Sequence, residues 1–203
     1  MSALRTKWFF AALGWVALLA GTAHAGSITY QIVVNTSALS GTTGYLDFQF
    51  NPGNTPFDPG SATLSGFTSD GTLGAALPDL GVVTGTLPGQ VVIDNTDLPN
   101  EYTQAFTYGS FFDVFVTLNV PVSGTATGGN SFTLDAEDSS FNPLLSSSFP
   151  AVEIDLNATT GSPTVINNTS GSASVNVTPE PATFALLGMG LAFVAWRGRR
   201  RTS

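Results

Sequence analysis

The sequence predicts an all-β protein, with a single antiparallel β-sandwich of jelly-roll-like topology between residues 26 and 156. In several segments apolar residues alternate with polar ones, which is the pattern of a strand with one buried face. Gly, Pro, Asn, Ser and Thr interrupt these segments and supply turn chemistry. No stretch of this region shows the periodicity of an amphipathic helix, so we expect about ten short strands in two packed sheets.

The expected strands follow one another along the chain between turn-forming residues. The clearest alternation covers residues 112–120, where Phe112 and Val114 face one side of the strand and Asp113 faces the other. Similar alternation covers residues 28–34, 46–50, 132–134 and 152–156, and further strands are expected at 62–67, 82–87, 91–93, 102–108 and 164–166. Turns are expected at residues 52–54, 58–60, 70–71 and 128–130.

The first 25 residues have the three parts of a secretory signal peptide. Arg5 and Lys7 form a basic head, residues 8–20 form a short apolar core, and Ala23 and Ala25 form a small-x-small exit. We therefore expect signal peptidase to cleave after Ala25 and the rest of the chain to be exported. The alternative is an uncleaved anchor helix, but the apolar run is shorter than the about 20 residues needed to span a bilayer.

Residues 157–178 are rich in Ser, Thr and Asn, a composition that favours a flexible spacer. Val165, Ile166, Val175 and Val177 favour strand pairing instead. Two interpretations therefore stay open for this segment, a final strand or a spacer that presents the C-terminal segment.

Residues 179–203 combine a proline motif, an apolar run and a basic end. Pro179, Glu180 and Pro181 come first, and because proline fixes φ and lacks an N–H, a helix can begin only after Pro181. Apolar residues 184–196 follow, and positive charge beyond such a run is retained on the cytoplasmic side. This order predicts a single transmembrane helix with the body outside. The basic stop inside consists of Arg197, Arg199, Arg200 and Arg201.

The motif, the apolar helix and the basic end together resemble the PEP-CTERM sorting signal of exported proteins from exopolysaccharide-producing Gram-negative bacteria. In that family a membrane-embedded exosortase recognises the signal and cleaves near the Pro-Glu-Pro motif. The resemblance therefore implies an exosortase partner and transient residence in the inner membrane. It also implies a final location in the cell envelope or outside the cell, in association with exopolysaccharide or biofilm.

Charge is divided unevenly along the chain. All six basic residues lie in the two terminal segments, whereas all but one of the 14 acidic residues lie between residues 26 and 178. A body without Lys or Arg cannot neutralise phosphates, which excludes nucleic-acid binding through the usual electrostatic contacts. The sole histidine, His24, belongs to the signal peptide, and the chain has no cysteine. We therefore expect no enzymatic activity, because most general bases and nucleophiles are missing.

Carboxylates are the remaining candidates for chemistry in the body. Asp135, Glu137 and Asp138 form the densest acidic group and offer oxygen ligands for a structural Ca²⁺. The competing interpretation is a solvated acidic edge without a metal, and we expect no other cofactor. Glu101, Glu137 and Glu153 are the glutamates available to a glycosidase, but no spacing pairs any two of them.

Aromatic residues suggest an alternative function. Tyr102, Tyr108, Phe111 and Phe115 would form a carbohydrate-binding face if exposed, although aromatic residues at alternating strand positions are more often core. The sequence as a whole favours a non-enzymatic exported protein of the envelope or extracellular matrix, sorted by an exosortase. The alternatives are a secreted carbohydrate-binding module and a surface protein anchored permanently by its C-terminal helix.

Overall fold

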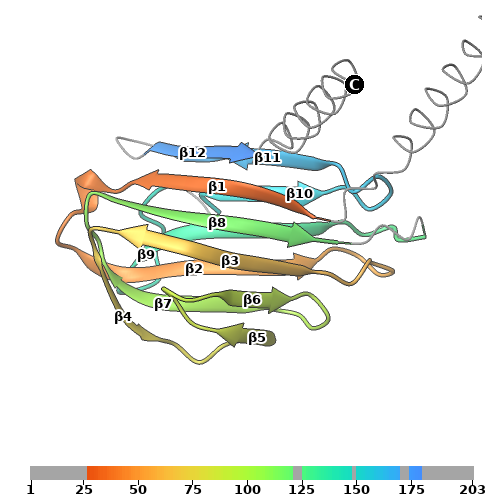
Figure 1. Cartoon of the computed structure of the whole chain (residues 1–203), viewed down its shortest axis with the longest axis horizontal. Helices are drawn as coiled ribbons and strands as arrows, with labels where there is room; N and C mark the ends of the chain where they lie inside the picture. Colours follow the sequence, from red (N-terminus) through yellow and green to blue (C-terminus); the bar gives the residue numbers. More distant parts are fainter. Residues whose placement is uncertain (1–26, 121–124, 148–149, 170–173, 180–203) are drawn as a thin grey trace, which may run out of the picture.

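The computed structural model describes residues 27–120, 125–147, 150–169 and 174–179, which form two antiparallel β-sheets (Figure 1). A 3₁₀ turn, Ser37–Leu39, follows the first strand. The twelve strands are β1 (Ile28–Asn35), β2 (Thr43–Pro52), β3 (Ser61–Ser69), β4 (Thr72–Ala76), β5 (Val82–Gly85), β6 (Val91–Asp94), β7 (Glu101–Thr107), β8 (Phe111–Asn119), β9 (Asn130–Asp138), β10 (Val152–Leu156), β11 (Pro163–Asn167) and β12 (Ser174–Pro179).

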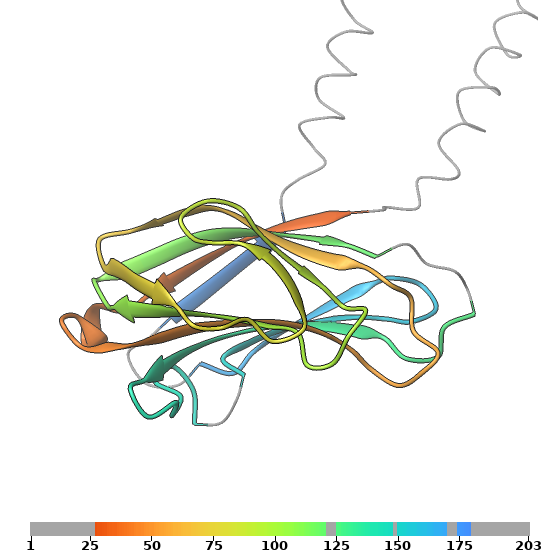
Figure 2. The ribbon, with the colours of Figure 1, turned by 90° about the horizontal axis from the view of Figure 1, so that it is seen from below.

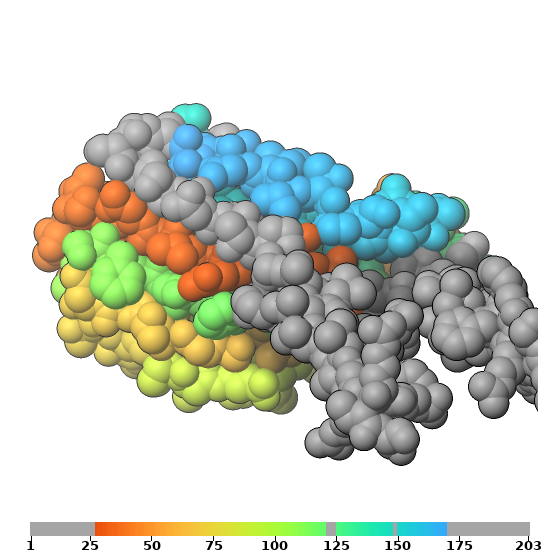
Figure 3. Space-filling model, turned by 45° about the horizontal axis from the view of Figure 1, so that its top comes forward, coloured from red at the N-terminus to blue at the C-terminus, as the bar shows by residue number. Residues whose placement is uncertain are grey.

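Each sheet contains six strands. The β1 sheet has the order β12-β1-β8-β3-β6-β5, and the β2 sheet has the order β11-β10-β9-β2-β7-β4. Figure 2 shows the two sheets as an upper and a lower layer, and Figure 3 shows β1, β8 and β3 side by side on the outer face of the β1 sheet. The predicted all-β class and the β-sandwich arrangement are confirmed.

The core lies between the two sheets and is built from the alternating residues of facing strands. Phe112, Val114 and Val116 point inward from β8, as the alternation predicts, and Leu46 and Phe48 point inward from β2. Each such side chain contributes roughly 1.5–3 kcal/mol when it leaves water. Three phenylalanines join the sheets at one end through ring contacts, with centroids 6.1–6.2 Å apart: Phe67, Phe106 and Phe112.

A buried polar network closes the opposite end of the core. Asn95 follows β6 and accepts the backbone N–H of Gly60 at 2.7 Å. Its amide also donates to the side-chain oxygen of Asn130, which begins β9, and to the carbonyl of Asp58 at 3.2 Å. Asn130 donates to the same carbonyl at 3.1 Å. The network therefore links a strand of each sheet to the loop before β3.

One strand, β4, was not predicted. Its sequence contains Gly74, Ala75 and Ala76, which are poor strand formers, and its residues are mostly exposed. It forms the outer edge of the β2 sheet through pairing with β7. Backbone pairing with β7 therefore defines this strand, and its own sequence shows no alternation of apolar and polar residues.

The segment from 157 to 178 contains strands of both sheets. β11 pairs with β10, and β12 pairs with β1. The predicted signal peptide and the predicted C-terminal helix lie outside the described residues. Within the described part of the chain, no helix has the length and apolar character needed to cross a bilayer.

Candidate functional site: an acidic hollow and the sorting edge

An acidic hollow of about 450 Å³ lies on the outer face of the β2 sheet. Three neighbouring strands, β7, β2 and β9, supply its floor, and the connection from β9 to β10 supplies part of its rim. That connection projects from the outer side of the lower sheet in Figure 2. The acidic hollow is lined by Asp47, Gln49, Glu101, Thr133, Asp135, Glu137, Phe141 and Pro150.

Sheet register brings the carboxylates of this hollow together. Asp47 on β2 lies directly opposite Asp135 on β9, and Gln49 on β2 lies opposite Glu101 on β7. Glu137 follows Asp135 by two residues, so both point to the same side of β9. Directly opposite side chains on neighbouring strands have Cβ atoms about 4.5–5.5 Å apart. Four acidic side chains from three strands therefore share one surface.

The two aspartates are buried although they carry oxygens without a hydrogen bond. Asp47 is 6% exposed and Asp135 is 1% exposed. Gln49 donates to Asp47 Oδ2 at 2.8 Å, and the backbone N–H of Ala136 donates to Asp135 Oδ1 at 2.8 Å. Asp47 Oδ1 and Asp135 Oδ2 have no partner among the described residues. A buried polar atom without a hydrogen-bond partner destabilises the folded state by about 1–3 kcal/mol, and by more when it is charged.

Burial changes the acidity of this group. It raises the pKa of Asp47 to about 7, with smaller contributions from the charges of Glu101 and Glu137. Burial also raises the pKa of Asp135 to about 7, against the opposing effects of the Ala136 and Ala151 backbone N–H groups. The pKa of Glu137 rises to about 7 as well, through burial first and then through Asp135. Asp47, Asp135 and Glu137 therefore ionise near neutral pH.

The predicted calcium ligands are only partly brought together. Asp135 and Glu137 line the acidic hollow, whereas Asp138 lies on the opposite side of the strand and accepts the backbone N–H groups of Ser140 and Asn142 at 2.7 and 2.9 Å. These bonds, led by that from Asn142, lower the pKa of Asp138. Among the described residues, no three Asp or Glu side chains are arranged to hold a metal ion.

Sequence reasoning missed Asp47 and Glu101 as members of the hollow. Both occupy outward positions in strands, which the alternation of β2 and β7 does indicate. Their proximity to Asp135 depends on strand order, which the pattern of a single strand does not contain. Of the three glutamates considered for a glycosidase, Glu101 and Glu137 line the hollow, and Glu153 lies on β10, where it accepts a hydrogen bond from Ser131.

The aromatic residues considered for sugar binding do not share one face. Tyr102 and Tyr108 are 0% and 2% exposed and belong to the core. The Tyr102 hydroxyl accepts the backbone N–H of Leu87 at 2.9 Å, and Tyr108 donates to the carbonyl of Tyr45 at 2.6 Å. Phe111 is exposed and Phe115 is partly exposed, both on β8 of the other sheet.

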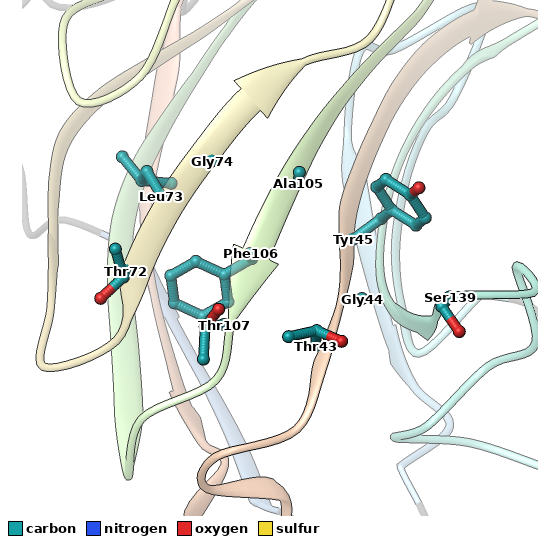
Figure 4. A pocket seen from close by; sticks show the side chains of 10 residues that line it. All are labelled: Thr43, Gly44, Tyr45, Thr72, Leu73, Gly74, Ala105, Phe106, Thr107 and Ser139. Atoms are coloured by element: carbon teal, nitrogen blue, oxygen red, sulfur yellow. The ribbon is translucent and has the colours of Figure 1, made fainter.

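A second, smaller hollow of about 240 Å³ adjoins the same strands. Figure 4 shows Tyr45 on one side of it and Thr72 and Leu73 on the other, with the Phe106 ring between them. Tyr45 also stacks on Phe141 of the acidic hollow, with ring centroids 4.6 Å apart. The stacked pair thus lies between the two hollows, and strand alternation does not indicate this contact.

The last described strand forms the edge of the β1 sheet beside β1. β12 runs antiparallel to β1, with Ser174 opposite Asn35 and Pro179 opposite Tyr30. Pro179 is the final residue of β12, and because β12 is an edge strand the missing N–H of proline is tolerated there. The predicted motif therefore begins at the last residue of the described structure.

A family model describing the PEP-CTERM protein-sorting motif matches residues 177–201. The chain carries a PEP-CTERM sorting motif. The match covers 25 of the 203 residues and starts at Val177, inside β12. The PEP-CTERM motif implies an exported protein with exosortase as its sorting partner and the envelope or the outside of the cell as its destination. No curated protein and no solved structure matches the chain significantly.

The PEP-CTERM match includes most of the C-terminal residues singled out in the sequence. Pro179, Glu180 and Pro181 fall within it, as do the arginines at 197, 199, 200 and 201. Of these residues only Pro179 belongs to the described part of the structure. The predicted signal-peptidase residues Ala23 and Ala25 also lie outside the described residues, and their role stays a prediction.

Proposed function

We propose that this protein is a non-enzymatic component of the cell envelope or extracellular matrix, released from its C-terminal segment by an exosortase. The PEP-CTERM match at residues 177–201 is the observation that carries the proposal. We further propose that residues 184–196 hold the chain transiently in the inner membrane until the motif is cut. Association with exopolysaccharide or biofilm belongs to the same proposal, through the family resemblance of the signal.

The position of the motif relative to the fold supports processing. β12 is the last element of the described structure, and every core residue of the described body precedes it. Cleavage beside Pro181 would leave both sheets whole. It would also remove Arg197 and the arginines that follow it, and removal of residues 1–25 by signal peptidase would then leave a body without Lys or Arg. Such a body has no electrostatic attraction to anionic membranes.

The order of the strands supports the jelly-roll-like topology that the sequence predicts. Successive strands from β1 to β4 alternate between the two sheets, and so do those from β6 to β9. Jelly rolls have this repeated passage between two sheets. We infer a jelly-roll-like body with β10, β11 and β12 added at one side.

Mass spectrometry of the mature C-terminus in the producing cells tests the sorting proposal. We expect a C-terminus near Pro181 in wild-type cells and an uncut chain in the Glu180→Ala variant. The matched control is Glu153→Ala, which removes the same side chain from a strand remote from the motif. An intact arginine-rich tail in wild-type cells, or equal cleavage of wild type and Glu180→Ala, would contradict the proposal.

A glycoside hydrolase is a second candidate, favoured by one observation. Glu101 and Glu137 line the same hollow. Most glycoside hydrolases use two carboxyl groups, one on either side of the glycosidic bond, as their catalytic groups. All three tryptophans, the residues best suited to stack on a sugar, lie outside the described residues. A reducing-sugar assay on extracellular polysaccharides distinguishes the candidates. We expect no release of sugar, and release that is lost in Glu137→Gln would establish the enzyme instead.

A further inference from the structure

Two buried carboxylate oxygens in the acidic hollow lack hydrogen-bond donors. Asp47 Oδ1 and Asp135 Oδ2 belong to residues that face each other across the β2–β9 ladder, and neither atom has a partner in the described part of the chain. Both residues line the hollow and are more than nine-tenths buried. Buried polar groups in native proteins are nearly always paired. The missing donors therefore point to a group that the protein binds from outside.

No cationic side chain of the body is available to pair with these acids. The acidic groups facing the hollow are Asp47 from β2, Glu101 from β7, and Asp135 and Glu137 from β9. Residues 27–179 contain no Lys, Arg or His. The negative charge can thus be balanced only by protons or by a cation from solution, and the unpartnered oxygens favour the cation when the acids are ionised.

The shape of the hollow favours an organic cation over a bare metal ion. Ca²⁺ needs six to eight oxygens at about 2.3–2.6 Å, and no group of three metal-binding side chains is arranged for an ion among the described residues. A volume of about 450 Å³ accommodates a ligand of many atoms. Phe141 and Pro150 add an apolar wall, and the Phe141 ring is held in place by stacking on Tyr45. Carbon atoms of a ligand can pack against that wall.

We propose that the acidic hollow binds a small organic compound through a primary ammonium group. An ammonium carries three N–H donors and no acceptor, so it can donate to more than one carboxylate of the hollow. Hydrogen bonds between charged groups are about twice as strong as neutral ones. A lysine-type side chain and an amino sugar share this chemistry. The site is independent of the sorting motif, and its loss leaves the proposed processing unaffected.

Ionisation of the hollow sets the pH at which such a ligand binds. The pKa values of Asp47, Asp135 and Glu137 all rise to about 7, mainly through burial. Below that pH these three carboxyl groups are protonated and neutral, and they no longer attract an ammonium. We therefore expect tight binding at pH 8 and weak binding at pH 5.

The test is calorimetric binding to the purified full chain in a nonionic detergent at low ionic strength. The probes are glucosamine and Nα-acetyl-lysine methylamide, and the N-acetylglucosamine and Nε-acetylated forms serve as neutral counterparts. We expect at least one amine to bind at pH 8 and to raise Tm by roughly 5–10 °C at about 100 times its dissociation constant. The amine that binds identifies the source of the ammonium group.

Two variants and one control locate the binding to the hollow. Asp47→Asn and Asp135→Asn each keep the size of the side chain and remove its charge, and we expect about tenfold or greater weakening, because a hydrogen bond to a charged group is lost. Asp97→Asn removes the same charge from an exposed position and is expected to bind as wild type. Four results would overturn the proposal: no binding by either amine, equal binding of the acetylated forms, stabilisation by CaCl₂ but not by amines, or equal weakening in the Asp97 variant.

Discussion

Replacing Asp47 with asparagine is expected to stabilise the protein at pH 8. Asp47 lies in the middle of β2, with Thr103 opposite it on β7 and Asp135 opposite it on β9. An asparagine oxygen can still accept the hydrogen bond that Gln49 donates at 2.8 Å. The new amide group adds N–H donors next to the Asp135 carboxylate. The substitution therefore removes a buried charge while it keeps the shape and the existing bond.

The size of the effect follows from the acidity of Asp47. Burial raises its pKa from 3.8 to about 7, so the folded protein holds the Asp47 proton more tightly than the unfolded chain does. The resulting stability is fully present below about pH 4 and is lost as the pH rises through about 7. Each pH unit corresponds to 1.36 kcal/mol, so the ionised carboxylate destabilises the fold by about 4 kcal/mol at pH 8. Asparagine does not ionise and avoids this penalty.

Differential scanning calorimetry at pH 5 and pH 8 measures the effect without added amine. We expect Asp47→Asn to exceed wild type at pH 8 by about 2–4 kcal/mol, or roughly 5–15 °C in Tm, and by much less at pH 5. Wild type itself is expected to be more stable at pH 5 than at pH 8. The exposed Asp97→Asn serves as the control and is expected to lie within about 0.5 kcal/mol of wild type. A Tm gain of equal size at both pH values, or a loss at pH 8, would refute the reasoning.

Two further substitutions test the buried hydrogen bonds, each by urea unfolding. Asn95→Ala leaves the N–H of Gly60 and the carbonyl of Asp58 with fewer partners and is expected to destabilise by about 2–4 kcal/mol. Tyr102→Phe removes the acceptor of the Leu87 N–H and is expected to destabilise by about 1–3 kcal/mol. Matched controls are Asn54→Ala at an exposed position and Tyr45→Phe on the outer face, both near zero. Equal losses in a variant and its control would contradict the assigned role of the bond.

Alternation of apolar and polar residues predicted the strands that have one face in the core and the other face in solvent. The strand β8 shows this best, because Phe112, Val114 and Val116 enter the core while Asp113 faces outward. The structure extends β9 through Asp135 and Glu137, which lie on one side of the strand. Alternation failed for β4, where Gly74 and the two alanines beside it give no alternation and pairing with β7 alone defines the strand.

The acidic hollow required information that no single segment contains. Asp47 and Asp135 are 88 positions apart and meet only because β2 and β9 are neighbours in register. Strand order is a property of the whole chain, so the sequence pattern supplied two of the four acids. Asp138 was included because it is adjacent in sequence, but adjacent strand residues point to opposite sides. Phe141 reaches the hollow from a turn with positive φ, for which alternation has no meaning.

The pairing of β12 with β1 has a consequence for the order in which the chain can fold during export. β1 is the first strand to leave the membrane in an N-to-C translocation, and its partner β12 is the last. Until then one edge of β1 has free N–H and C=O groups, which are a template for pairing with another chain. Contacts between distant segments also form slowly, because a long loop must close first. Completion of this sheet therefore coincides with arrival of the sorting motif. A molecule whose β1 sheet is still incomplete would thus still carry its uncut C-terminal segment.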